Sequence, residues 1–254
     1  MLASSHNQVL VVCSIIVAIL ASYTALNMAS RVSSASGRSA VLWLVGGSFA
    51  MGFGIWSMHF IGMLAFRLPI ALGYDVPLTL LSLLIAIASS ALALYLVCQD
   101  KLPWGRLVSG GVLMGLGIAC MHYTGMEAMR MNPHIFYVPW IVVLSIVIAI
   151  IASMAALWLA FRLREEAKRA TFARIGAALV MGCAIIGMHY TGMAASKFPI
   201  NSFCGAANSG IDTKWLAVLV IIVSLSVFAI ALIVSMLDVR TSRLANSLPG
   251  FGRI

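Results

Sequence analysis

The sequence contains very little charge for its length. Only 9% of its 254 residues are charged and 7 side chains are acidic, whereas 62% of the residues are hydrophobic. A soluble domain needs enough polar side chains to cover its core, and a disordered chain is polar or highly charged, so this composition excludes both classes. We therefore expect a protein that crosses the lipid bilayer several times.

Cysteine is also scarce, and it gives no indication of a disulfide framework. The chain has five cysteines, an odd number, and only Cys204 falls in a segment that we expect outside the membrane. The formal net charge of +9 is carried by short segments between long apolar runs, where basic side chains contact anionic lipid headgroups. We therefore exclude nucleic acid as a partner.

Long apolar runs make up most of the chain. A helix needs about 20 apolar residues to cross the hydrocarbon layer, and seven segments qualify: 8–29, 40–66, 78–98, 107–129, 138–160, 173–195 and 215–237. The segments between them are too short to bury a core of their own. The expected fold is therefore all-α, a bundle of seven transmembrane helices within residues 1–237.

The distribution of Lys and Arg predicts the orientation of this bundle. Cytoplasmic segments carry an excess of basic residues, and an external N-terminus leaves only Arg67, Arg130, Lys197 and Lys214 outside. The other basic residues then lie inside: Arg31, Arg38, Lys101, Arg106, Arg162, Arg164, Lys168, Arg169, Arg174, Arg240, Arg243 and Arg253. We therefore expect the N-terminus outside and the C-terminus in the cytoplasm.

One motif occurs three times in the chain. Residues 51–65 read MGFGIWSMHFIGMLA, residues 114–128 read MGLGIACMHYTGMEA, and residues 181–195 read MGCAIIGMHYTGMAA, with eight of fifteen positions identical. The copies are 63 and 67 residues apart, about the length of a helical hairpin with its loops, so we expect one leading helix followed by three repeated hairpins. Each motif then lies on a helix that runs outward, and all three reach the same depth.

In each copy, one helical face carries a histidine, a methionine and two glycines. Positions three, four and seven residues apart share a face, and glycine allows neighbouring helices to approach closely. The histidines are His59, His122 and His189, and the methionines four residues later are Met63, Met126 and Met193. The packing glycines are Gly52, Gly115 and Gly182 before the histidines, and Gly62, Gly125 and Gly192 after them.

A second stripe of each helix carries further methionines. Met58, Met121 and Met188 directly precede the histidines and are candidate ligands, whereas Met51, Met114 and Met181, eight residues before them, are interpreted as packing residues. Tyr123 and Tyr190 follow two of the histidines and have hydroxyls that can orient a ligand or a bound water. Phe60 takes this position in the first copy, so the tyrosine is not indispensable.

Three imidazoles that converge from three helices form the outline of a metal site. Thioether sulfur is a poor ligand for Zn²⁺, Mg²⁺ or Ca²⁺, whereas imidazole together with thioether suits copper in either oxidation state. We therefore predict copper, held by the three histidines and the methionines at −1 and +4, just inside the outer boundary of the membrane. Zinc and haem are weaker alternatives. The residues fix neither the number of ions nor their oxidation state.

Several functions are consistent with such a site. A sensory module would bind a small ligand at the copper and shift the last helix. A copper transporter or acceptor would need ligands in the inner halves of the helices, where Met28, Met154 and Met236 are scattered. A three-histidine metalloenzyme would need a general base, and only Glu127 lies near the site. We favour the sensory module.

The repeated motif resembles the MHYT family of bacterial integral-membrane sensor domains. Its tetrapeptide stands intact at Met121–Thr124 and Met188–Thr191, while the first copy departs from it at Phe60 and Ile61. The resemblance covers nearly the whole chain. It implies a multi-pass protein of the bacterial cytoplasmic membrane with a copper site near the outer face. It also implies sensing of a diatomic gas such as O₂, CO or NO, and fusion to cytoplasmic domains that make or degrade cyclic di-GMP.

None of those catalytic domains is expected within these residues, so this chain is not predicted to be an enzyme. We interpret residues 238–254 as a short cytoplasmic tail or the start of a linker to an output domain. The module would then act on a cytoplasmic signalling domain in the same chain or in a separate partner, and a homodimer is left open.

Overall fold

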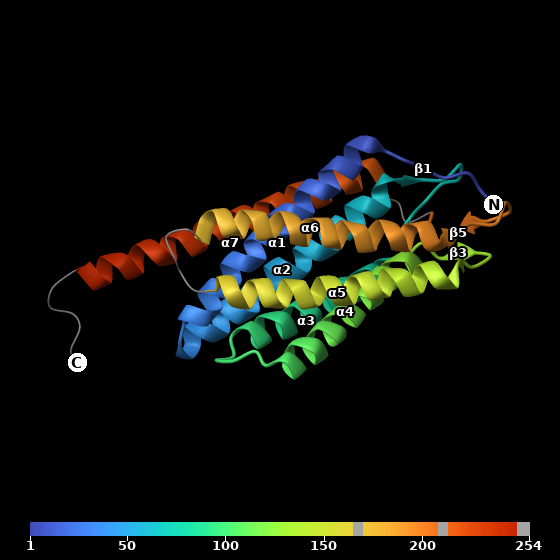
Figure 1. Ribbon diagram of the computed structural model, residues 1–254. Coiled ribbons are helices and arrows are strands. Elements are labelled where there is room, and N and C mark those ends of the chain that lie inside the picture. Colours follow the sequence, from blue (N-terminus) through green and yellow to red (C-terminus); the bar gives the residue numbers. More distant parts are fainter. Residues whose placement is uncertain (165–169, 208–212, 248–254) are drawn as a thin grey trace.

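The structure is a computed structural model that describes residues 1–164, 170–207 and 213–247. These residues form seven helices and three pairs of very short strands (Figure 1). The helices are α1 (Gln8–Ser34), α2 (Gly37–Ala65), α3 (Val76–Val97), α4 (Trp104–Glu127), α5 (Pro139–Leu163), α6 (Ala170–Ala195) and α7 (Thr213–Ser247). The strands are β1 (Ser5–His6), β2 (Phe66–Arg67), β3 (Met131–Asn132), β4 (Phe136–Tyr137), β5 (Ser196–Lys197) and β6 (Phe203–Cys204).

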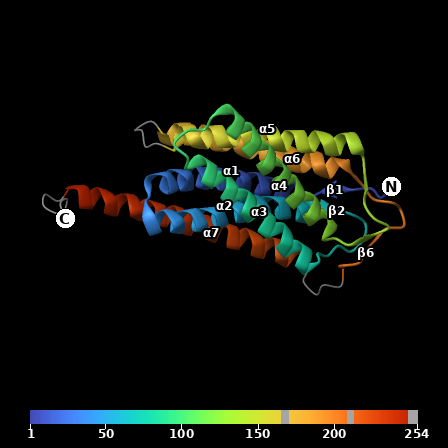
Figure 2. The same ribbon diagram turned by 90° about the horizontal axis from the view of Figure 1, so that it is seen from below.

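All seven helices are long and apolar enough to cross a membrane, which confirms the predicted seven-helix fold. Large apolar side chains such as Leu42, Leu84 and Ile222 are exposed on the outside of the bundle, where lipid surrounds them. The N-terminus and the strands gather at one end, here called the strand end, and α7 runs to the opposite end (Figures 1 and 2). Helix α7 extends through the first part of the expected tail to Ser247. Residues 248–254 and the basic residues Lys168 and Arg169 lie outside the described ranges.

Local sequence signals set the first turns of the helices at the strand end. The side chain of Asn7 accepts hydrogen bonds from the amides of Val9 and Leu10, and Asp75 accepts one of 3.0 Å from the amide of Leu78. Both residues thereby satisfy amide groups that the first turn of a helix leaves without partners. Helix α5 begins with Pro139, a residue that suits the first helical position because its missing N–H would be unpaired there.

Six of the helices form a closed ring. Helices α1 to α6 each pack against the next, and α6 packs back against α1, while α7 lies outside the ring against α1 and α2 (Figure 2). Helix α1, the leading helix of the sequence, therefore closes the ring in space. The repeating unit of the packing is consequently α1 with α2, α3 with α4, and α5 with α6.

Backbone hydrogen bonds at the strand end follow the same threefold pattern. The residue before each of α1, α3 and α5 donates its amide to an alanine six residues after a motif histidine. These bonds are Asn7 to Ala65 at 2.8 Å, Asp75 to Ala128 at 2.7 Å, and Val138 to Ala195 at 2.9 Å. Antiparallel pairing of β1 with β2, β3 with β6, and β4 with β5 adds to this end of the bundle. The three motif helices are thus tied to the strand end at equivalent points.

The glycines seven residues before the histidines allow each motif helix to approach its neighbour. A Cβ atom on Gly52 would lie 2.5 Å from the Cα of Ile87 in α3, and one on Gly115 would lie 2.6 Å from the Cα of Ile150 in α5. A Cβ atom on Gly182 would lie 2.9 Å from the side-chain Cγ1 of Ile19 in α1. Because the contacts at Gly52 and Gly115 are with backbone, a side chain at either of these positions would push two helices apart.

Candidate metal centre

The three motif histidines meet inside the ring. They come from α2, α4 and α6, and each is at most 1% exposed. The Nδ1 atom of His59 lies 3.1 Å from the Nδ1 atoms of both His122 and His189. The ring centroids are separated by 4.8, 5.1 and 5.3 Å. The convergence that the repeat predicts is therefore present, and the three residues form a group that could hold a metal ion.

Each imidazole ring rests on a glycine of another repeat. A Cβ atom on Gly125 would clash with Nε2 of His59, one on Gly192 with Nε2 of His122, and one on Gly62 with Nε2 of His189. The contacts thus run in a cycle from α2 to α4, from α4 to α6, and from α6 back to α2. The sequence analysis interpreted these glycines as positions where two helix backbones approach closely. In the structure, the space beside each glycine is instead occupied by an imidazole ring of another helix.

In this cyclic arrangement the Nδ1 atoms face the centre of the cluster. They cannot all find a hydrogen-bond partner among one another. A neutral imidazole has one N–H donor and one acceptor nitrogen. The single Nδ1 of His59 lies in contact with two other Nδ1 atoms, and it can serve as donor or as acceptor but not as both. The three Nε2 atoms are buried without a hydrogen-bond partner. Three buried rings in this state are costly, at about 1–3 kcal/mol for each unpaired polar group.

The donor set fits a small metal ion. Three nitrogens bound at about 2.0–2.1 Å are separated from one another by roughly 3.3–3.6 Å, and the observed 3.1 Å contacts are a few tenths of an ångström shorter. The ligand nitrogens of the three residues all lie within 4.8 Å of one another, so a small rearrangement of the rings would bring one nitrogen of each onto a single ion. Residues His59, His122 and His189 would hold that ion through Nδ1.

The candidate methionine ligands are buried in the same region. Met58, Met121 and Met188, directly before the histidines, are 1–3% exposed, and Met63, Met126 and Met193, four residues after them, are 0–4% exposed. Four residues correspond to about 6 Å along a helix, so the latter three lie toward the strand end. Glu127 is the acidic residue nearest to the histidines in the sequence. Its side chain is about half exposed, and its Oε1 lies 3.7 Å from Nδ1 of His134.

The tyrosines of the motif bond to serines of the neighbouring helices. The hydroxyl of Tyr123 lies 2.7 Å from Oγ of Ser145 in α5, and that of Tyr190 lies 3.0 Å from Oγ of Ser14 in α1. In the first copy, where Phe60 replaces tyrosine, the indole of Trp56 donates to Ser82 of α3 at 3.0 Å. The tyrosine rings contact the preceding histidines edge to face.

Sequence reasoning missed these serines, although their positions carry a signal. Ser14, Ser82 and Ser145 are 68 and 63 residues apart, nearly the spacing of the motifs themselves, and each is at most 1% exposed. They lie in helices without the conspicuous motif, where a repeat of single residues is hard to recognise. They indicate that the threefold pattern extends to α1, α3 and α5.

A polar cap closes the strand end above the histidines. The hydroxyl of Tyr74 donates to the carbonyl of Met63 at 3.2 Å, and the thiol of Cys204 donates to the carbonyl of Met129 at 2.8 Å. Burial raises the pKa of Tyr74 well above its usual range, with a further contribution from Cys204. Tyr74 is therefore a neutral hydrogen-bond donor near pH 7, and Cys204 is a free cysteine in the structure.

Seven apolar helices, six of which surround a buried threefold histidine cluster, define a multi-pass membrane protein with a candidate metal centre. Three stretches of the chain, residues 52–110, 115–173 and 182–245, match the family described as the bacterial signalling protein N terminal repeat, or MHYT. The chain belongs to the MHYT family. The predicted resemblance is thereby confirmed, and the protein is a multi-pass protein of the bacterial inner membrane.

Relatives of this chain are larger signalling proteins. It is 68% identical over 252 residues to the bifunctional diguanylate cyclase/cyclic di-GMP phosphodiesterase MucR of Pseudomonas aeruginosa, with 98% of this chain and 37% of the relative covered. It is 43% identical over 192 residues to the cyclic di-GMP phosphodiesterase NbdA of the same species, with 75% of this chain and 24% of that protein covered. It is 38% identical over 196 residues to the signaling protein YkoW of Bacillus subtilis, with 76% and 24% covered. No solved structure matches the chain.

Proposed function

We propose that this chain is the sensory module of a membrane signalling protein, and that it holds copper at His59, His122 and His189 to detect a diatomic gas or a redox change. The observation that carries the proposal is the burial of three Nδ1 atoms around one centre. A packing role alone does not require three imidazoles to face one another on the axis of a bundle. The names of MucR and NbdA support cyclic di-GMP as the signal that the module controls.

Copper fits the chemistry of the donors better than other metals do. The group consists of neutral imidazoles, and the buried residues next to it in sequence are methionines, whose thioethers favour copper over zinc. Bound copper would supply a coordination position for O₂, CO or NO. In this proposal the three histidines hold and orient the ion, while the apolar bundle excludes water from it.

The orientation in the membrane follows from charge. We propose that the strand end faces the outside, because this places most of the basic residues in the cytoplasm. The histidines then lie near the outer face, where a periplasmic signal reaches them. Helix α7 runs to the cytoplasmic side, where an output domain in the same chain or in a partner would receive the signal.

The residues at the end of the ring opposite the strand end favour a metal ion that stays bound over one that is transported. Three leucines from equivalent positions of α1, α3 and α5 line a small cavity inside the ring, on the side of the histidines away from the strand end. These residues, Leu26, Leu94 and Leu157, are 1–2% exposed. Aliphatic side chains offer a metal ion no ligand. An ion bound at the histidines would therefore meet an apolar closure on the way to the cytoplasm.

Helix α7 is in contact with the helix of His59 and can transmit a change at the site. Phe228 of α7 packs against Gly54, five residues before His59, so closely that a Cβ on Gly54 would lie 2.9 Å from its ring. Near the cytoplasmic end, Arg31 of α1 pairs with Asp238 of α7 at 3.4 Å. Movement of the histidine rings on ligand binding would shift α2 and thereby the residues that Phe228 contacts.

Metal analysis tests the copper site. Protein purified in detergent, washed with a chelator and reloaded with copper is compared with the triple variant His59→Ala, His122→Ala and His189→Ala by elemental analysis. We expect one copper ion per chain that depends on the histidines. Equal copper in the two proteins would reject the site.

Gas binding is tested separately. The reduced, copper-loaded protein is exposed to CO and its infrared spectrum is recorded. We expect a band of copper-bound CO in the wild type that is missing in the triple histidine variant. If copper depends on the histidines but no such band forms, the metal site stands and gas sensing by CO binding is rejected.

A further inference from the structure

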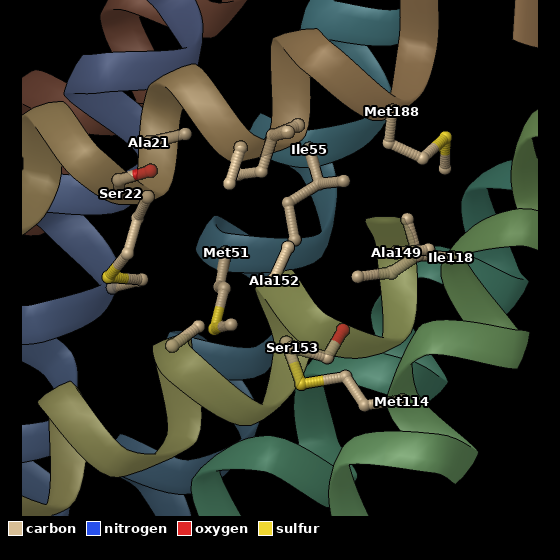
Figure 3. Close-up of a pocket in the computed structure, with 15 residues that line it drawn as sticks. Ala21, Ser22, Met51, Ile55, Met114, Ile118, Ala149, Ala152, Ser153 and Met188 are labelled. Carbon is tan, nitrogen blue, oxygen red and sulfur yellow. The ribbon is translucent and has the colours of Figure 1, made fainter. Parts of the chain in front are cut away.

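A second set of three side chains, from one position of the repeat, lines a common cavity deeper in the bundle. A cavity of about 30 Å³ lies between α1, α2, α4, α5 and α6, and Met51, Met114 and Met181 all line it; Figure 3 labels the first two. These methionines occupy one position of the repeat, eight residues before each histidine, and are 3–6% exposed. The same three residues also line the adjoining cavity of about 20 Å³ toward the cytoplasmic leucines.

A buried hydroxyl without a partner faces the first cavity. Ser153 of α5 is 2% exposed, it lines the cavity, and its Oγ atom makes no hydrogen bond. Figure 3 shows its side chain together with those of Met51 and Met114 around the same space. A buried hydroxyl without a hydrogen-bond partner is unfavourable, so a ligand in the cavity would give Ser153 the partner that it lacks. Ser22, which also lines the cavity, differs because its hydroxyl donates to the carbonyl of Ala18 at 2.8 Å.

We propose that this cavity is a second metal site, which binds a soft monovalent ion such as Cu⁺ through Met51, Met114 and Met181 with Ser153 as an oxygen donor. Eight residues of helix correspond to roughly 12 Å, so the three methionines lie at a different depth from the histidines, although Met188, next to His189, also lines the cavity. Neutral thioethers select soft ions. A single positive charge is also far less costly than a double one where no acidic side chain lines the described cavity.

The proposal goes beyond a sensor with one metal centre. A chain with both sites would hold two ions of different ligand chemistry on one axis, an imidazole site near the outer face and a thioether site near the middle of the bundle. The thioether site would favour the reduced ion. The occupancy of the inner site would then depend on the supply of reduced copper, independently of the outer one.

Silver binding tests the inner site. Ag⁺ is a redox-inert soft monovalent ion, so it serves as the probe. Chelator-washed protein is titrated with Ag⁺ and silver per chain is measured after desalting, for the wild type and for the triple variant Met51→Leu, Met114→Leu and Met181→Leu. We expect the variant to bind one ion fewer per chain, and Ser153→Ala to weaken that ion by about tenfold.

A matched control and a second background make the result decisive. Met28→Leu, Met154→Leu and Met236→Leu, a triple variant outside both cavity linings, should bind as much silver as the wild type. The loss of one ion should also appear when the cavity methionines are replaced in the triple histidine variant, which separates this proposal from the copper site. Methionine and leucine have similar volumes, so the bundle should fold. If the triple cavity variant does not fold, the three single variants are titrated instead, and each should bind the ion more weakly. Unchanged silver in the cavity variants, or an equal loss in the control, would overturn the proposal.

Discussion

Each imidazole of the cluster occupies space that a glycine of another helix leaves free because it has no Cβ atom. Gly125, Gly192 and Gly62 lack the Cβ that would occupy the place of Nε2 in His59, His122 and His189. The glycine therefore fixes how far each ring extends and which nitrogen faces the centre. This role could not be predicted from the sequence, because spacing within one helix does not reveal which side chain of another helix fills the gap.

Gly125→Ala tests this role of the glycines. The added methyl group displaces the ring of His59, so we expect copper binding at the histidines to weaken by about 10- to 100-fold. Gly187→Ala is the matched control, because nothing lies within 4 Å of its Cβ position although it is only two residues from His189. The control should bind copper normally and gain about 0.5–1 kcal/mol of helix stability. Equal affinities in the two variants, measured by competition with a chelator, would contradict the assigned role.

At the scale of the helices, the sequence predicted the spans well and their arrangement only in part. Apolar length alone locates a membrane helix, and the span predicted over 78–98 corresponds to α3 at Val76–Val97. The closure of the ring by α1 could not be predicted, because no motif in α1 repeats those of α2, α4 and α6. Its kinship with α3 and α5 rests on single buried serines such as Ser14 and on backbone bonds such as that from Asn7 to Ala65.

The cap of α3 predicts a dependence of stability on pH. The hydrogen bond from the amide of Leu78, followed by the contact with Arg130, lowers the pKa of Asp75 below its ordinary value of 3.8. A lowered folded-state pKa stabilises the fold above the unfolded value, and that stability is lost as the pH falls through the folded value. Asp75→Asn should therefore melt at a lower temperature than the wild type at pH 6, and the difference should shrink below about pH 4.

Asp100→Asn, a substitution in the loop between α3 and α4, is the control for this measurement. Its melting temperature should follow that of the wild type at each pH. A constant difference between Asp75→Asn and the wild type from pH 6 to pH 3 would show that the charge of Asp75 does not stabilise α3.

At the scale of the whole molecule, three layers follow one another along the axis of the ring. Of these layers, the histidines lie closest to the strand end, the cavity methionines follow in the middle, and the leucines lie toward the opposite end. The repeat predicted the histidine layer, because one identical residue per copy at equal depth must converge when the copies surround an axis. The leucine layer was not predicted, since leucine is common in every apolar helix and its spacing carries no distinctive signal.

Helix α7 lies outside the ring, which predicts that the metal site does not need it. A chain that ends before Thr213 retains α1 to α6 with all three histidines and their glycines. In lipid, the contacts of α7 with α1 and α2 are replaced by contacts with acyl chains at little cost. We expect this shortened protein to bind one histidine-dependent copper ion per chain by elemental analysis. Loss of that copper in a protein that keeps its helical circular dichroism would contradict the independence of the ring.

The measurement that tests the central claim most directly is the X-ray absorption spectrum at the copper edge. The sample is the variant with leucine in place of Met51, Met114 and Met181, loaded with one equivalent of copper, so that only the outer site can contribute. We predict a nitrogen shell at about 2.0 Å with the scattering pattern of three imidazole rings. A spectrum without imidazole scattering would contradict the claim that His59, His122 and His189 hold one metal ion.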